Sequence, residues 1–471
     1  MKICAGLRAR AINPMRIRAT RRNPLKTPFS LPGFPRPTLT VASLLLSCIL
    51  SCSAVAWAGW VQRYGGGDFA TGIAVDRGGN VYVTGESTGN HTYLDYATVK
   101  YDRYGSRKWV ARYNGPKNYN DEAAAIALDR DGNVYVTGTS MGLDSGYDYA
   151  TVKYDTNGKR QWVRRYNGPQ NKNDKAVALA VDGGGNVYVT GRVDGESTYS
   201  HFGTIKYDTN GKRQWVRHYK GPWNARTPIG IALDGIGNVY VAGAADPENY
   251  DYVTIKYGAD GGLKWERHYN GPGGLYDMPA AMAVDRSGNV YVTGGSMGSE
   301  DYGSLDYATI KYDTEGNEKW VRRYNGPRNE NDTGKAIAVD SAGNVYVTGE
   351  AEGIYSYLDY TTIKYDADGN RQWIKRLQGP HDAWDTPTAI GVDSAGNVYV
   401  TGQAVDASGL SKYGTVKYDT DGNRQWVRME VVGTATALVV TAGGNVYVTG
   451  GSPNMYSGAD YVTIKYDTNG N

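Results

Sequence analysis

The pentapeptide Gly-Asn-Val-Tyr-Val occurs eight times, and this repetition constrains the fold more than any other feature of the chain. Its Asn falls at positions 80, 133, 186, 238, 289, 344, 397 and 445, so the units are 48 to 55 residues apart. A period of this size is typical of propellers and solenoids rather than of unrelated domains. We therefore expect one repeat array, although a length of 471 residues alone suggests about three domains.

Each unit predicts four short strands, for example "AIAVD", "NVYVTG", "DYATVKYD" and "WVRRY". Val and Ile alternate with Tyr, Thr and Lys at a period of two, and no segment carries a long helical stripe. Clusters of Asp, Asn and Gly separate the first strand from the second and the third from the fourth, as tight hairpins require. The pattern predicts an all-β propeller built from four-stranded antiparallel blades.

The two ends of the array complement each other. A Trp strand at residues 60–64 precedes the first full unit, whereas the last unit ends at residue 471 without its Trp strand. Eight Trp strands then match the eight pentapeptides. Because a propeller removes its open seam by building one blade from both chain ends, we predict eight blades over residues 59–471, closed by the N-terminal strand.

The units "GIAVDRGGNVYVTG" and "YATVKYDTNGKRQWVRRY" resemble the SBBP β-propeller repeat of exported and cell-surface proteins of bacteria and archaea, and more distantly the NHL repeat. The resemblance extends over residues 60–471. It implies a propeller fold, with seven blades as the alternative to eight, and it specifies function only weakly. The segment "GKRQW" at 158–162 also resembles the docking motif of eight-bladed quinoproteins, which implies a Trp packed between blades.

Residues 1–58 differ from the repeats and predict an export leader. They hold nine Lys or Arg residues and no acidic residue, and an apolar segment at 39–58 ends in Ala56-Trp57-Ala58, the pattern of a signal-peptidase site. Cleavage, lipidation at Cys52 and retention as an uncleaved anchor remain open. All three cysteines lie in this leader, so the propeller is expected to contain no disulfide: Cys4, Cys48 and Cys52.

The charge of the propeller gives no reason to expect nucleic acid as a partner. Without the leader, the chain contains 42 of the 51 basic residues and all 48 acidic residues, which gives a net charge of −6. We expect a secreted, cell-surface or periplasmic protein that contacts a membrane only through a retained or lipidated leader.

Repeated polar residues are expected to serve packing rather than catalysis. A Lys in each third strand is predicted to lay its stem over aromatic rings and to pair its ammonium with a turn Asp. His218 and His268 take the place that Arg112, Arg165 and Arg323 hold in other units, so we interpret them as substituted repeat positions. No catalytic triad, zinc spacing or phosphate-binding loop is present in the sequence.

Sequence variation is confined to one face. In an antiparallel meander, the connections after strands one and three emerge on one face, and these are nearly invariant. The connections after strands two and four vary in length and are rich in Tyr, Ser, Gly, Asn and Asp, as recognition loops are. The candidate binding residues in them are Tyr93, Asp95, Tyr147, Asp148, Tyr199, Trp223, Tyr250, Asp251, Tyr276, Asp306, Asp359, Trp384, Tyr456 and Asp460.

These patterns predict a non-catalytic, exported scaffold whose variable face binds an extracellular or envelope protein or a glycan. The alternative is a secreted or periplasmic polysaccharide hydrolase or lyase that uses acidic loop residues. We expect no cofactor, although the acidic loops allow weak Ca²⁺ binding.

Overall fold

The computed structural model describes residues 59–65, 68–89, 93–196, 200–221, 225–245, 250–298, 304–353, 357–379, 383–454 and 458–471. All of them belong to one unit, Ala56–Asn471, which is described alone. The predicted export leader, with its cleavage site and the three cysteines, lies outside the described residues.

The described chain forms eight four-stranded sheets, which we number as blades in chain order. In each blade the strands run from inner through second and third to outer. Blade 1 holds β2 (Asp68–Val75), β3 (Val81–Thr88), β4 (Leu94–Tyr101) and β5 (Arg107–Tyr113). Blade 2 holds β6 (Asp121–Leu128), β7 (Val134–Met141), β8 (Tyr147–Tyr154) and β9 (Arg160–Tyr166). Blade 3 holds β10 (Asp174–Val181), β11 (Val187–Asp194), β12 (Ser200–Tyr207) and β13 (Arg213–Tyr219). Blade 4 holds β14 (Ala225–Leu233), β15 (Val239–Ala245), β16 (Tyr252–Tyr257) and β17 (Leu263–Tyr269).

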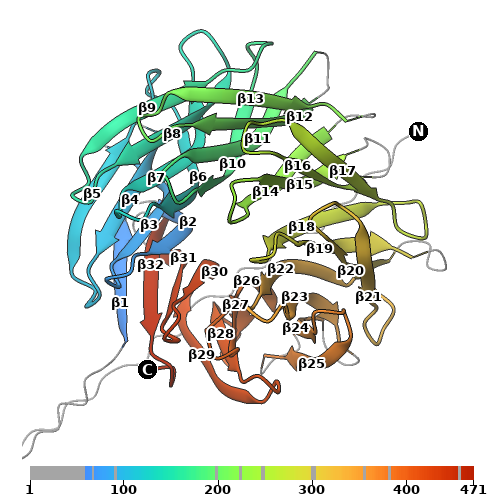
Figure 1. The fold of residues 1–471 in the computed structure, drawn as a ribbon. Helices are drawn as coiled ribbons and strands as arrows, with labels where there is room; N and C mark the ends of the chain where they lie inside the picture. The colour runs from blue at the N-terminus through green and yellow to red at the C-terminus, as the bar shows by residue number, and fades with distance from the viewer. Residues whose placement is uncertain are drawn as a thin grey trace, which may run out of the picture. The chain divides into compact units, whose positions relative to one another are not determined.

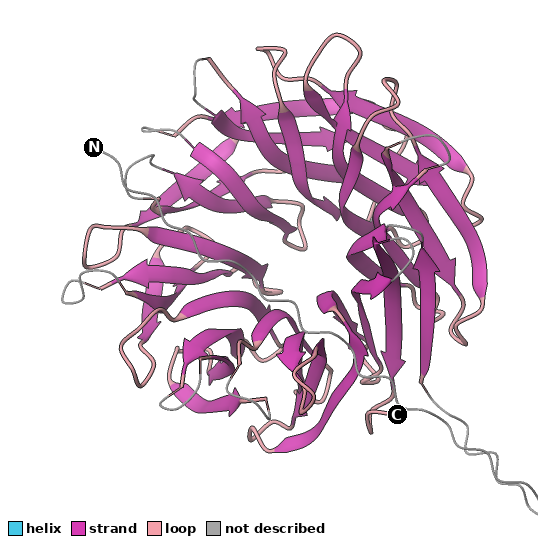
Figure 2. Cartoon of the chain, turned by 180° about the vertical axis from the view of Figure 1, so that it is seen from behind, coloured by secondary structure: helices cyan, strands magenta, loops and turns pink. Residues whose placement is uncertain are grey.

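The second half repeats this plan. Blade 5 holds β18 (Asp277–Val284), β19 (Val290–Met297), β20 (Leu305–Tyr312) and β21 (Glu318–Tyr324). Blade 6 holds β22 (Thr333–Val339), β23 (Val345–Glu352), β24 (Leu358–Tyr365) and β25 (Arg371–Leu377). Blade 7 holds β26 (Thr386–Val392), β27 (Val398–Val405), β28 (Ser411–Tyr418) and β29 (Arg424–Val432). Blade 8 holds β30 (Thr434–Val440), β31 (Val446–Asn454), β32 (Gly458–Tyr466) and β1 (Trp60–Gly65). Figure 2 shows strands and loops throughout the described part.

The eight sheets close into a ring. Each inner strand contacts the inner strands of both neighbouring blades, including β2 with β30. Blade 8 has the order β1-β32-β31-β30, with antiparallel pairs from Trp60↔Lys465 to Gly65↔Asp460. Figure 1 shows β1, at the start of the colour bar, beside β32 at its end. The predicted eight blades and their closure by the N-terminal strand are therefore confirmed, and the seven-bladed alternative is wrong.

A tryptophan joins each blade to the next. Trp109 Nε1 on β5 donates a hydrogen bond at 3.1 Å to the carbonyl of Thr156, in the turn between the third and outer strands of blade 2. Gly158 of that turn has a φ of 81°, and a Cβ on it would lie 2.7 Å from the Trp109 ring. Glycine is therefore required both by the backbone and by the ring beneath it. The same donor bond, at 3.0 to 3.3 Å, recurs around the whole ring from Trp60, Trp162, Trp215, Trp265, Trp320, Trp373 and Trp426.

The repeated lysines also serve packing between blades. Their Nζ atoms lie 4.9 to 5.9 Å from the ring centres of second-strand tyrosines. The predicted aromatic contact is confirmed, but the predicted Asp partner is wrong where the ammonium bond is described. Lys100 Nζ, for example, donates to the Thr156 carbonyl at 3.0 Å, because the next blade presents that oxygen beside the Tyr ring.

Candidate functional site

The two faces of the ring differ in how far their connections vary. All eight turns between inner and second strands have five residues, and so do the seven turns between third and outer strands of blades 1 to 7. We call the side that carries them the turn face. On the opposite side, the loop face, the loops between second and third strands range from three to seven residues. The connections from each outer strand to the next blade emerge there as well, so the predicted confinement of variation to one face is seen in the structure.

Three of the inter-blade connections share the pattern Asn-Gly-Pro-x-Asn-x-Asn-Asp, at 114–121, 167–174 and 325–332. In the first, Asn114 Nδ2 donates to Asn118 Oδ1 at 2.5 Å, and Asn118 has a φ of 53°. Asn120 Oδ1 accepts a bond from the Leu94 amide at 3.3 Å, and Asp121 Oδ2 accepts one from the Gly115 amide at 2.5 Å. Asparagine and aspartate thus fix the loop, which leaves its fourth and sixth side chains free to vary.

Aromatic residues meet in three pairs on the loop face, and all of them except the half-buried Tyr250 are exposed. Each pair joins a residue of the second-to-third-strand loop to one in the connection that leaves the same blade. The ring centres lie 4.7 Å apart in Tyr93–Tyr119 of blade 1, 5.4 Å apart in Tyr250–Tyr276 of blade 4, and 6.3 Å apart in Tyr357–Trp384 of blade 6. We call these six residues the aromatic pairs. Exposure reaches 57% for Tyr93 and 62% for Trp384, which is unusual for side chains of this size.

One member of the aromatic pairs is also held in an uncommon backbone conformation. Tyr250 has a φ of 58°, while the other described non-glycine residues with positive φ are all asparagines. A left-handed conformation costs a bulky residue about 1 to 2 kcal/mol, so it persists where the surrounding structure imposes it. Such strain is concentrated at functional sites, which supports a role for this loop.

The predicted acidic residues occupy a different environment. Asp95, Asp148, Asp306, Asp359 and Asp460 are at most 9% exposed. Their shared position is the start of the third strand, beside the outer strand that carries an Arg. The sixth, Asp251, precedes β16 and is half-buried.

Blade 2 shows how such an aspartate is used. Arg165 donates to Asp148 Oδ2 at 2.8 Å, to Ser140 Oγ at 2.5 Å and to the Tyr113 hydroxyl of blade 1 at 3.0 Å. Blade 5 repeats this set, which we call the arginine cluster, with Arg323. The carboxylates are thus engaged inside the blades, and a role for them in binding a ligand or Ca²⁺ stays a prediction.

Blade 3 replaces the arginine cluster with two histidines. His201 Nε2 and His218 Nδ1 are 2.7 Å apart, and His218 Nε2 lies 2.6 Å from the Tyr166 hydroxyl of blade 2. Burial lowers the pKa of His201 to about 4, with a smaller contribution from His218, and burial together with Lys220 lowers the pKa of His218. His218 pairs with Gly203 as Arg165 pairs with Ala150, which confirms His218 as a substituted repeat position. His268 likewise pairs with Val253 on the third strand of blade 4.

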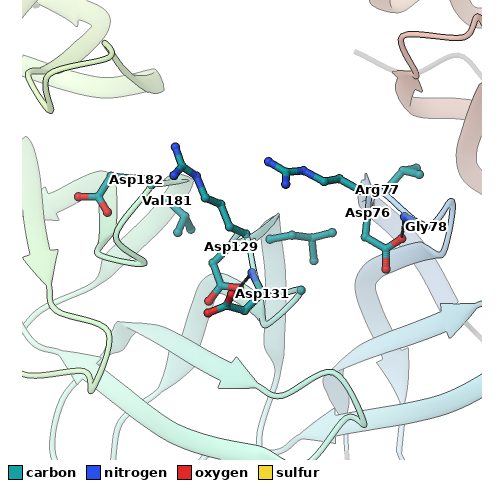
Figure 3. A pocket seen from close by; sticks show the side chains of 12 residues that line it. Asp76, Arg77, Gly78, Asp129, Asp131, Val181 and Asp182 are labelled. Carbon is teal, nitrogen blue, oxygen red and sulfur yellow. Dashed lines mark hydrogen bonds between the residues drawn. The ribbon is translucent and has the colours of Figure 1, made fainter.

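Two hollows lined by described residues lie on the turn face. One, of about 500 Å³, is lined by inner turns of blades 1 to 3 (Figure 3). The side chain of Arg77 extends over it, whereas Asp76, Asp129 and Asp182 each accept bonds from two backbone amides, an Asn and a Tyr of their own blade. These carboxylates are therefore structural. The other hollow, of about 530 Å³, lies between the outer parts of blades 2 and 3, beside Trp162.

The structure brings together part of the predicted site. Tyr93, Tyr250, Tyr276 and Trp384 all belong to the aromatic pairs, while Tyr147 lies apart with Lys175 Nζ 5.4 Å from its ring centre. Three predicted residues lie outside the described ranges: Tyr199, Trp223 and Tyr456.

Sequence reasoning missed Tyr119 and Tyr357. The repeat could have revealed Tyr357, because it precedes "LDY" just as Tyr93 does. Tyr119 stands at the variable sixth position of its connection. This position can be recognised as variable only after the structure has shown which Asn and Asp residues fix the loop.

The described residues include no group of three or more His, Cys, Asp or Glu side chains placed to hold a metal ion. Over the same ranges, no helix has the length and apolar character needed to span a membrane.

Comparison with solved structures supports the fold. The Dos1 propeller matches with a TM-score of 0.57 at 10% identity, over 87% of this chain and 94% of that one. A eukaryotic initiation factor matches with a TM-score of 0.45 at 10% identity, over 85% and 86% of the two chains. A gluconolactonase from Xanthomonas campestris matches with a TM-score of 0.34 at 12% identity, over 71% and 89%. At these identities the first likeness shows the fold alone, and the other two carry no argument about function.

Comparison of sequences identifies the repeat. A search of curated proteins finds no match. The family model of the SBBP β-propeller repeat matches residues 59–91, 109–143, 319–356 and 372–404. The first match joins the closing strand β1 to β2 and β3, and the others each join an outer strand to the first strands of the next blade. The SBBP repeat is thus present in four places within a ring of eight four-stranded blades, and the chain is a β-propeller repeat protein.

Proposed function

We propose that this protein is an exported, non-catalytic scaffold that binds an extracellular or envelope protein or glycan through its loop face. The observation that carries the proposal is the set of three aromatic pairs, five of whose six residues are exposed, all on the face whose connections vary. A propeller of repeats is itself suited to interaction, because a rigid ring presents many loops on one side.

The loop face has the physical properties of a recognition surface. Tyr and Trp supply large contact areas at a small entropic cost, and such residues dominate the binding energy of interfaces. The Asn and Asp bonds within the connections hold the loop backbone in place before a partner arrives. Less ordering is then needed on binding, which favours affinity.

The leader supports export. Its basic start, apolar segment and Ala-Trp-Ala end are those of a signal peptide. The net charge of −6 on the remaining chain favours partners other than nucleic acid. We propose a secreted, cell-surface or periplasmic location, with membrane contact only through the leader.

The proposal is tested by comparing capture through the two faces. The immobilised protein is incubated with an envelope extract, beside a loop-face variant in which all six residues of the aromatic pairs are changed to Ser. The control is Tyr104→Ser, which removes a 72% exposed Tyr from a turn of blade 1 on the opposite face. We expect the native protein and the control to retain the same proteins or glycans and the loop-face variant to lose them. Equal recovery by all three contradicts the proposal.

A further inference from the structure

The aromatic pairs are separated from one another rather than gathered into one patch. They lie in blades 1, 4 and 6, so neighbouring pairs are three, two and three blade positions apart around the ring of eight. A globular protein partner buries a continuous apolar core at the centre of its interface. Separate aromatic sites with polar loops between them suit an extended ligand that repeats a small unit with one apolar side.

A sugar ring has that character. One side of a pyranose presents C–H groups that pack on an aromatic ring, while its edge carries hydroxyls that need polar neighbours. The rings of the three pairs are tilted by 40°, 50° and 44°, so each pair offers two inclined faces rather than a flat stack. Exposed polar side chains adjoin the first pair, since Lys117 and Asn118 precede Tyr119 in the same fixed loop.

The charges of the loop face favour a neutral ligand. The exposed loops of this face carry both signs, with Lys117, Lys172 and Arg328 against Asp144, Glu196 and Glu330. An acidic polymer would need a surface of one sign. Tyr147 on the same face differs from the aromatic pairs, because the Lys175 ammonium lies over its ring.

We propose that the loop face binds a neutral polysaccharide, with one sugar unit packed on each aromatic pair. This inference rests on the proposed function and names its ligand class. Tyr250 supports it independently, because its left-handed backbone turns a bulky ring to the partner ring of Tyr276 at a cost in strain.

Affinity electrophoresis of the full chain tests the inference. Native gels contain barley β-glucan, galactomannan, xyloglucan or dextran, and a fifth gel contains the anionic polymer polygalacturonate. Each aromatic pair is changed to Ser in a separate variant, with Tyr104→Ser as the control on the turn face. We expect at least one neutral polymer to retard the protein, each pair variant to bind it about 5- to 10-fold more weakly, and the control to match the native protein. Equal melting temperatures of the variants show that folding is unchanged.

Three results would overturn the inference: no retardation by any neutral polymer, retardation by polygalacturonate alone, or retardation that none of the pair variants alters. The capture experiment separates these failures from failure of the proposed function. Loss of a bound protein in the loop-face variant, without any polysaccharide binding, leaves the scaffold function in place with a protein as its partner.

Discussion

Acidification is expected to destabilise blade 3 through its histidine pair. His201 is 5% exposed, and its pKa falls from 6.5 to about 4 in the fold because burial disfavours the charged ring. His218 and Lys220 lower the His201 pKa further, and Asp194, the smallest contribution, raises it. A histidine that is neutral in the fold binds more protons when unfolded. Its contribution to stability is therefore complete above pH 6.5 and is lost as the pH falls towards 4.

The magnitude follows from linkage. With pKa values of 6.5 unfolded and about 4 folded, His201 alone accounts for about 2 kcal/mol of unfolding free energy lost between pH 7 and pH 5. Asp174 of the same blade acts in the opposite direction. Burial raises its pKa to about 6 despite bonds from the Gly168 and Asp194 amides, so its protonation favours the fold as the pH falls below 6. The pH dependence of the whole protein mixes both effects, and a matched variant is needed to separate them.

Blade 2 supplies the design of that variant. Changing Val193→Ser, His201→Asp and His218→Arg copies the arginine cluster of blade 2 into blade 3 and leaves Asp174 in place. Urea unfolding at pH 7 and pH 5 is then compared for the two proteins. We expect the native protein to lose about 2 kcal/mol more than the variant on acidification. An equal loss in both proteins would refute the assignment of acid sensitivity to the histidine pair.

Three further outcomes are expected. Gly158→Ala should lower the unfolding free energy by about 3 kcal/mol, because the new Cβ lies 2.7 Å from the docked Trp109 ring and the residue keeps a φ of 81°. The control Gly409→Ala has a φ of 80° but no atom within 4 Å, so it should cost only about 1 kcal/mol. Equal urea midpoints for the two variants would contradict the docking role of Trp109. Deleting residues 59–65 removes the outer strand of blade 8 and should lower the melting temperature by several degrees, so an unchanged melting curve argues against closure. Arg165→Met should lower the free energy of unfolding in urea by about 3 kcal/mol or more, because it leaves the buried Asp148 carboxylate without its charged partner. The double variant Arg165→Met with Asp148→Leu should recover most of that loss, and no recovery would contradict the pairing.

The fold could be predicted from the sequence because all eight repeat units carry the same pattern of strands and turns. The second strands are buried on both faces, and the alternation of "NVYVTG" sets which neighbouring blade each side chain packs against: Tyr82 packs with blade 2, and Val81 and Val83 pack with blade 8. The five-residue turns fix the register of the second strand with the inner strand and of the third strand with the outer strand. Closure also follows from the sequence, since Trp60 begins a strand whose partners are found only in the last unit. Repetition supplied eight independent tests of one interpretation.

The candidate site was predictable only in part, for a physical reason. Asp148 stands at the boundary between a variable loop and a strand, where sequence alone suggests exposure. Its burial depends on Arg165, which lies opposite the third strand in a register that the structure reveals. The aromatic pairs pose the same difficulty, because Tyr93 and Tyr119 belong to different loops and meet only when the blade folds.

The replaced arginine clusters explain where this face can vary. Removing one partner of a buried charge pair leaves the other uncompensated, at a cost of about 3 to 5 kcal/mol, so the Arg and Asp of a cluster are expected to change together. Blade 3 changes three positions at once, and in blade 7 Met429 stands at the Arg position while Lys412, at the Asp position, pairs with Asp406 at 2.7 Å. The Ser position is less constrained, because Ala351 takes the place of Ser140 in blade 6 while Asp359 and Arg376 are kept. Exposed loop side chains are less constrained again, and five of the six residues of the aromatic pairs are exposed. We therefore expect that these rings can be selected for a partner without loss of the fold, and that specificity follows them rather than the buried carboxylates.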